Sequence, residues 1–268
     1  VVKIVHDELV ATLGSEHQLI DLNAPAPVAI MMVGLQGSGK TTAAGWLLTT
    51  IPDSKRIFTI ENGSRELELV REENGKVVNS VVHTLTRDSE NERQRIDQIA
   101  LVDICLRFNP DILVVGEMRG AEANAAQEAA RVGVAVLTTI HSNSCEATYR
   151  RMVSLCKRAV DMSDETLLSY VTEAYPIVVF CKQLENKQRR MMEIMECEIL
   201  PNGDRRYNTL FRYIITENHM KDGKFVIEGH HTQVNEISVS LRKRLLENGM
   251  PNEELQTLLK PKKEVNAT

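Results

Sequence analysis

A glycine-rich segment has the residue types and the spacing that phosphate chemistry requires. It consists of Gly34, Leu35, Gln36, Gly37, Ser38, Gly39, Lys40, Thr41 and Thr42, and it matches the pattern G-x-x-x-x-G-K-[ST]. Six apolar residues precede it and a helical stretch follows, which is the context of a phosphate-binding loop. Glycines let backbone N–H groups point into one concavity, and the helix N-terminus adds positive potential for an anion. The segment therefore predicts a nucleotide-phosphate site.

Two side chains of this segment have distinct predicted roles. Lys40 can reach the β- and γ-phosphates, and the Thr41 hydroxyl can ligate Mg²⁺. We expect the nucleotide to be bound by Gly34, Gln36, Gly37, Ser38, Gly39, Lys40, Thr41 and Thr42.

Polar side chains also follow three later strands that the sequence predicts to be buried. Glu61 follows the apolar run 56–60, Glu117 and Arg119 end the run 112–120, and His141 follows 134–140. The carboxyl ends of parallel strands lie along one edge of a sheet, so these side chains could converge with Lys40 on one γ-phosphate. Hydrolysis needs an acid that orients or deprotonates water, and a polar group near the γ-phosphate completes the set.

Each of these residues also has a structural explanation. Glu61 could be a surface acid or a helix cap, and Glu117 could merely form an ion pair with Arg119. A histidine after a strand, such as His141, is more often structural than catalytic. The position of all these residues at strand ends, in strands that alternate with helices, favours function.

Composition limits the class of protein. The 268 residues are 43% hydrophobic and 26% charged, with a net charge of −5, which predicts a soluble fold and no nucleic-acid partner. Five cysteines without a C-x-x-C pair suggest neither a disulfide framework nor a zinc site, and predict a cytoplasmic location. No apolar run approaches the ~18 residues of a membrane span, so we expect any membrane role to come through a partner.

The order of predicted elements is that of an α/β protein. Turn residues 73–76 predict a hairpin with a returning strand at 77–82. A helix over about 96–107 is predicted to bury Ile96, Ile99, Leu101, Val102, Ile104, Cys105 and Leu106. Ser163 is a predicted helix cap. From residue 177 the pattern predicts strands in a β-meander packed beside the main sheet, followed by two short helices.

The first 42 residues resemble the signal recognition particle GTPase. The resemblance rests on residues 1–10, 26–30 and 34–37, and it implies the junction between the helical N domain and the first G-domain motif. No D-T-A-G-R and no T-K-x-D occurs downstream, so a GTPase interpretation has one motif of several.

A wider stretch resembles the type II/type IV secretion ATPase superfamily, closest to the branch that drives tight-adherence pili. Residues 60–67, 106–120 and 137–144 are similar to its Asp box, atypical Walker B and His box. The resemblance implies a P-loop, RecA-like fold and a homohexameric ATPase that uses MgATP and works on a membrane platform protein. It also implies that Glu117 is the catalytic acid beside Arg119, that Glu61 assists Mg²⁺ or water, and that His141 contacts the γ-phosphate region.

The sequence departs from this family at three places, one of which is Gly133-Val134 in place of the usual Gly-His. Asn62 stands where the Asp box usually has Asp, and only about 27 residues precede the first strand, where the family has a separate N-terminal domain that supplies arginines. We therefore expect a motor domain with weak turnover unless a neighbouring subunit supplies arginines; the candidates are Arg65, Arg71, Arg87 and Arg107.

The predicted organisation has four parts. They are a helical leader and linker (1–26), a P-loop ATPase core (27–176), the β-meander and helical appendage (177–260) and a tail (261–268). The predicted location is the cytoplasm, peripheral at the inner face of the cell membrane. The alternatives are a signal-recognition-type GTPase and a nucleotide-binding assembly module with little hydrolysis.

Overall fold

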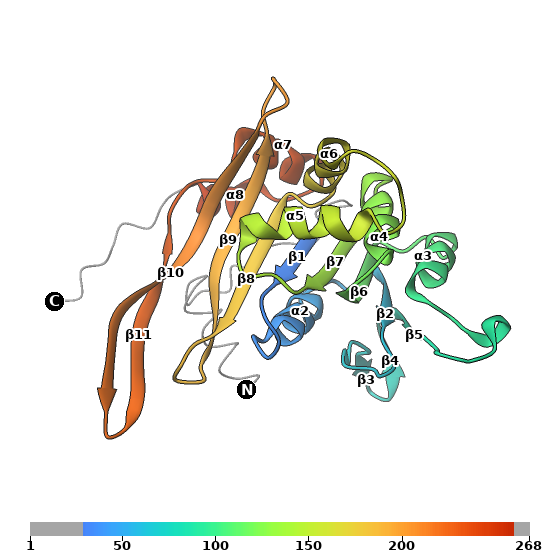
Figure 1. The fold of residues 1–268 in the computed structure, drawn as a ribbon, viewed down its shortest axis with the longest axis horizontal. Coiled ribbons are helices and arrows are strands. Elements are labelled where there is room, and N and C mark those ends of the chain that lie inside the picture. The colour runs from blue at the N-terminus through green and yellow to red at the C-terminus, as the bar shows by residue number, and fades with distance from the viewer. Residues whose placement is uncertain (1–28, 260–268) are drawn as a thin grey trace.

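One nine-stranded sheet forms the centre of the computed structural model, which describes residues 29–259 (Figure 1). Its strand order is β11-β10-β9-β8-β1-β7-β6-β2-β5. The strands are β1 (Ile30–Val33), β2 (Arg56–Glu61), β5 (Ser80–Leu85), β6 (Ile112–Met118), β7 (Ala135–Ile140), β8 (Ile177–Gln183), β9 (Arg189–Ile199), β10 (Arg205–Lys221) and β11 (Lys224–Gln233). Neighbouring strands in the part β8-β1-β7-β6-β2-β5 are parallel, and neighbouring strands in the part β11-β10-β9-β8 are antiparallel.

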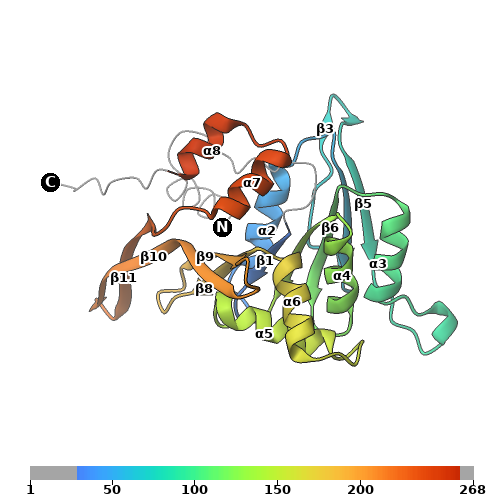
Figure 2. The same ribbon diagram turned by 90° about the horizontal axis from the view of Figure 1, so that it is seen from above.

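Helices cover both faces of the parallel part of the sheet, as Figure 2 shows. Helix α2 (Lys40–Thr49) packs on one face, in a cluster that includes Met32, Leu48 and Ile112. The other face carries α3 (Gln98–Arg107), α4 (Glu122–Arg131), α5 (Cys145–Cys156) and α6 (Asp164–Ala174). Helices α7 (Val239–Glu247) and α8 (Asn252–Leu258) lie on the α2 side. The structure confirms the predicted α/β fold with a large sheet and flanking helices.

Side-chain caps set the starts of several helices. Ser163 accepts a hydrogen bond from the Thr166 N–H through its hydroxyl, which confirms the predicted cap of α6. Asp97 and Ser144 cap α3 and α5 in the same way. Each cap satisfies one of the N–H groups that a helix leaves unpaired in its first turn.

The hairpin turn at 73–76 is confirmed, but the returning strand at 77–82 is wrong. Asn74 and Gly75 have positive φ values of 52° and 73° between β3 (Glu72–Glu73) and β4 (Lys76–Val77). The Asn79 side chain then accepts from the Arg71 N–H at 2.9 Å and donates to the Leu69 carbonyl at 2.8 Å. These bonds take the place of further strand pairing, and the chain leaves the hairpin to pair as β5 with β2 in the main sheet.

The sequence predicted too many buried residues for α3. Gln98, Leu101, Val102 and Cys105 are buried, whereas Ile99, Ile104 and Leu106 are 37%, 43% and 40% exposed. Ile96 precedes the helix and pairs with Arg87 in an isolated bridge. The Asp97 cap starts the helix later than predicted, and a surface helix buries only one stripe of its circumference.

The C-terminal strands continue the main sheet and do not form a separate layer beside it. Strand β8 pairs with β1 on one edge and with β9 on the other. The β10–β11 hairpin extends from this region as a long arm (Figure 1). The predicted division at residue 177 stays a prediction, and the predicted leader and tail lie outside the described residues. No helix in the described range is both long and apolar enough to cross a membrane.

A buried hydrogen bond ties α5 to the end of α6 and gives a test of this packing. The fully buried Tyr149 hydroxyl donates to the Tyr175 carbonyl at 2.8 Å. We expect Tyr149→Phe to lower the free energy of unfolding by about 1–2 kcal/mol, because the carbonyl loses its buried donor. Denaturant titration measures this loss. The control is Tyr170→Phe, whose ring lies under Arg131 on the half-buried surface of α6; an equal loss in both variants would contradict the role of the hydroxyl.

Candidate active site

The predicted phosphate-binding loop connects β1 to α2 and depends on its glycines for its shape. A Cβ at Gly34 would lie 2.1 Å from the Cys181 carbonyl oxygen and 2.6 Å from the Ser38 hydroxyl, so a side chain at this position has no space. Gly37 and Gly39 have φ values of 78° and 90°, in the left-handed region that favours glycine. The loop therefore runs close against the backbone of β8.

Lys40 starts α2 and is almost fully buried. Its side chain donates to the Leu35 carbonyl at 3.0 Å, across the loop. Burial lowers the pKa of its ammonium group, against the opposing effects of Glu117 and Cys181. The buried Ser38 hydroxyl has no hydrogen-bond partner among the described residues. Gln36 is exposed, and Thr41 and Thr42 are half-buried in the first turn of α2.

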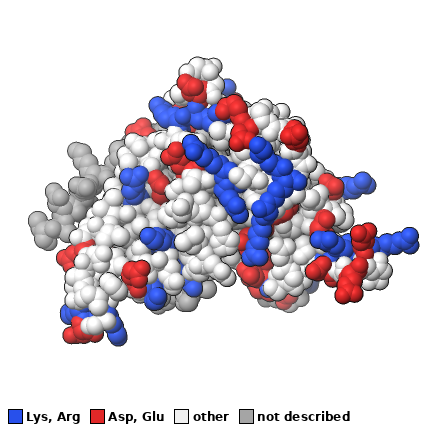
Figure 3. Space-filling model, viewed as in Figure 1, with Lys and Arg blue, Asp and Glu red and all other residues white. Residues whose placement is uncertain are grey.

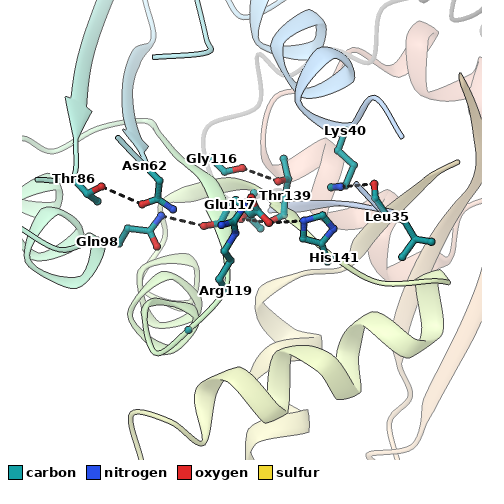
Figure 4. A network of polar contacts seen from close by, with 12 residues as sticks. Leu35, Lys40, Asn62, Thr86, Gln98, Gly116, Glu117, Arg119, Thr139 and His141 are labelled. Carbon is teal, nitrogen blue, oxygen red and sulfur yellow. Dashed lines mark hydrogen bonds and ion pairs between the residues drawn. The ribbon is translucent and has the colours of Figure 1, made fainter. Parts of the chain in front are cut away.

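Glu117 forms the centre of a polar network at the end of β6 (Figure 4). One carboxylate oxygen lies 2.7 Å from His141 Nε2, and the other accepts from the Arg119 guanidinium at 2.6 Å. Burial alone raises the pKa of Glu117. The Arg119 hydrogen bond and the charges of His141, Arg119 and Lys40 outweigh this effect and lower the pKa below its ordinary value. Glu117 is therefore ionised at neutral pH.

Hydrogen bonds from neighbouring elements fix the backbone around Glu117. Thr139 on β7 donates to the Gly116 carbonyl at 2.7 Å, and Gln98 on α3 donates to the Glu117 carbonyl at 3.1 Å. The Glu122 carboxylate accepts from the Arg119 and Gly120 N–H groups at 2.5 and 2.7 Å. The turn after β6 is thus held from three sides, which orients the Glu117 side chain.

Glu61 lies at the end of β2, one strand beyond β6, and is 4% exposed. Its Oε1 accepts from the Glu66 and Leu67 N–H groups at 2.8 and 3.1 Å, and its Oε2 lies 3.9 Å from His83 Nδ1. Among the described residues its polar contacts are therefore with the following loop and with β5. The structure brings Glu117, Arg119 and His141 into direct contact, and it does not bring Glu61 into that network.

The four candidate arginines differ in their contacts. Arg65 pairs with Glu68 at 2.9 Å and Arg71 pairs with Asp53 at 2.6 Å, so both are engaged within this chain. Arg87 is exposed and donates to the Gln94 carbonyl at 2.6 Å, and Arg107 is exposed in the last turn of α3.

Arg189 contacts the loop, and the sequence did not identify it as a site residue. It donates to the Gly37 carbonyl at 2.8 Å across 152 positions of the chain. A sequence pattern does not show a contact of this kind, because strand pairing creates it.

The donor set fits a magnesium nucleotide. Among residues 29–259 no group of three or more His, Cys, Asp or Glu side chains could by itself hold a metal ion. Proteins usually bind Mg²⁺ through one or two side chains together with substrate phosphates and waters. The half-buried Thr41 hydroxyl and the Ser38 hydroxyl, which has no hydrogen-bond partner among the described residues, supply oxygen atoms suited to that arrangement.

Comparisons with known proteins point to one family. The family described as "Type II/IV secretion system protein" matches residues 9–261. The type IV secretion system protein PtlH of Bordetella pertussis is 29% identical over 194 residues, which are 70% of this chain and 56% of PtlH. The signal recognition particle protein of Escherichia coli is 28% identical over 137 residues, which are 46% of this chain and 30% of that protein.

Among solved structures, the VirB11 ATPase from the Brucella suis type IV secretion system has a similar fold. Its TM-score is 0.53 at 24% identity, over 63% of this chain and 48% of that one. The chain spans less than two thirds of the length of each of these three proteins. The family match nevertheless covers almost the whole chain, from before the predicted phosphate-binding loop to beyond the end of α8. The chain therefore belongs to the type II/IV secretion system protein family.

Proposed function

We propose that this chain binds MgATP and hydrolyses it as the motor domain of a secretion or pilus-assembly ATPase. The observation that carries the proposal is the Glu117 carboxylate, held between Arg119 and His141 at the sheet edge where the phosphate-binding loop begins. Membership of the secretion family supports the same conclusion.

In this proposal the loop and Lys40 bind the phosphates. The backbone N–H groups of residues 34–42 cradle them, and Lys40 exchanges the Leu35 carbonyl for phosphate oxygens. Thr41 would hold Mg²⁺, which neutralises phosphate charge when it is bound. The ionised Glu117 orients the attacking water and accepts its proton as the water oxygen bonds to the γ-phosphorus and the ADP oxygen leaves.

His141 and Arg119 act next to Glu117. His141 directly follows β7, which lies between β1 and β6 in the sheet, and there it can contact the γ-phosphate. Arg119 is 67% exposed while it contacts Glu117, so it can reach a ligand or a neighbouring subunit. Glu61 assists water or Mg²⁺ through Oε2, because its Oε1 is used by the loop that follows.

We propose that the working form is a homohexamer at the cytoplasmic face of a membrane, acting on a platform protein. Arg87 and Arg107 are the better candidates to act across a subunit interface, because Arg65 and Arg71 are paired with acids of their own chain.

Figure 3 shows Lys and Arg interspersed with Asp and Glu on the face that carries α5 and α6. Such a mixed surface suits a protein partner better than a nucleic acid.

A signal-recognition-type GTPase is the second candidate, favoured by the similarity to the Escherichia coli protein. A competition assay with ATP and GTP distinguishes the two functions. Preference for GTP would overturn the ATPase proposal.

Replacing Lys40 tests the loop. We expect Lys40→Ala to raise the Kd for MgATP at least tenfold, about 1.4 kcal/mol, because the phosphates lose their buried cation. Calorimetry measures the Kd, and Lys76→Ala, an exposed residue of the β3–β4 hairpin, is the control. Unchanged binding and turnover in Lys40→Ala would overturn the assignment of the loop.

Replacing Glu117 separates binding from chemistry. Glu117→Gln keeps the size of the side chain and removes its charge, so we expect turnover to fall by about 10²-fold or more while MgATP binding persists. Phosphate release under saturating MgATP measures turnover. Glu128→Gln, on the exposed side of α4, is the control. Loss of binding in Glu117→Gln would count against a catalytic role.

The dependence of ATPase activity on protein concentration tests the motor. We expect the rate per subunit to rise as the chains associate, because a neighbouring subunit then supplies arginines to the site. Light scattering on the same samples gives the mass of the assembly. A rate that stays at zero while the chains associate would instead support a nucleotide-binding assembly module.

A further inference from the structure

Arg189 joins the antiparallel half of the sheet to the phosphate-binding loop. It is the first residue of β9 and pairs with Gln183, the last residue of β8. Its Nε donates to the Gly37 carbonyl at 2.8 Å. A cationic donor on a carbonyl makes a stronger hydrogen bond than a neutral donor does.

The aliphatic part of Arg189 also covers the loop. A Cβ built on Gly39 would lie 3.1 Å from Arg189 Cδ and 3.7 Å from its Cβ, so the stem of the arginine packs directly on this glycine. Gly39 immediately precedes Lys40 and caps α2 in a left-handed conformation. Arg189 therefore contacts the loop both at its apex and where it enters the helix.

The start of the loop is fixed by the same pair of strands. Gly34 lies against the Cys181 carbonyl on β8, so closely that a Cβ there would be 2.1 Å from the oxygen. The loop thus has one contact with β8 at Gly34 and a second with β9 at Gly37. Its geometry depends on the position of the β8–β9 hairpin.

We propose that Arg189 is a positioning residue that holds the phosphate-binding loop in its nucleotide-binding geometry. This inference rests on the proposed nucleotide-binding function. Arg189 keeps the Gly37 peptide turned outward and the backbone at Gly39 in place, and the loop then presents its N–H groups to the phosphates. Displacement of the β8–β9 hairpin by a partner would loosen the nucleotide through the same contacts.

The hairpin offers a matched control at the neighbouring position. Lys182 is exposed on β8 and pairs with Arg190. Successive residues of a strand point to opposite faces, so Lys182 faces away from the side of the sheet that carries Gln183, Arg189 and the loop. Lys182→Ala therefore removes a positive charge from the same hairpin without touching the loop.

The experiment compares the full chain with Arg189→Ala, Arg189→Lys and Lys182→Ala. Hydrogen exchange of peptides spanning 34–42, measured without ligand, reports how ordered the loop is. Calorimetry with MgADP measures the Kd for the nucleotide. Thermal unfolding shows whether each variant is folded. We expect faster loop exchange and about a tenfold higher Kd in Arg189→Ala, equal to about 1.4 kcal/mol. Lys182→Ala should behave as wild type, and Arg189→Lys should fall between the two.

Several results would overturn this role. They are wild-type exchange and affinity in Arg189→Ala, an equal effect in Lys182→Ala, or a lower unfolding temperature with unchanged affinity. Restored affinity with fast loop exchange in Arg189→Lys would also overturn it, because charge alone would then act on the nucleotide. If the wild-type chain binds no MgADP, the proposed function fails, while ligand-free exchange still tests whether Arg189 orders the loop.

Discussion

The two-sided parallel pairing of β1 is the constraint on which the site depends. Val33, the last residue of β1, pairs with Ile140 on β7 and with Phe180 on β8. The predicted phosphate-binding loop therefore begins at the same level as His141 on one side and Cys181 on the other. This register brings the loop to the sheet edge where β6 presents Glu117, and it also places β8 close enough to make Gly34 obligatory.

Electrostatics reinforce this arrangement. Lys40 is almost fully buried, and burial lowers the pKa of its ammonium group. The negative charge of Glu117, on β6, two strands from β1 in the sheet, opposes this effect. Against the effect of burial, the Arg119 hydrogen bond and the charges of His141, Arg119 and Lys40 hold the pKa of Glu117 below its ordinary value. The charges of Lys40 and Glu117 are thus mutually dependent, so the removal of either one changes the pKa of the other.

Local sequence predicted much of the fold but few of the contacts between elements that are far apart in the chain. Some signals depend only on neighbouring residues: the glycine pattern, the acids at strand ends and the Ser163 cap. The structure has strands and helices where these signals predicted them. Asn79 redirected a predicted strand through side-chain bonds to a segment some ten residues away. Arg189 reaches the loop only because β8 pairs with both β1 and β9, and strand pairing of that range leaves no local pattern.

The length of β10 has a mechanical consequence. Residues 205–212 of β10 pair with β9 and residues 211–221 pair with β11, so the part that extends beyond β9 is a two-stranded hairpin, ~30 Å long at ~3.3 Å per residue. A tilt of about 5° at the base of a hairpin this long displaces its far end by about 3 Å. Because the hairpin leaves the sheet beside β9, whose first residue contacts the predicted phosphate-binding loop, the β10–β11 arm has the geometry of a lever pivoted on the strand that carries Arg189.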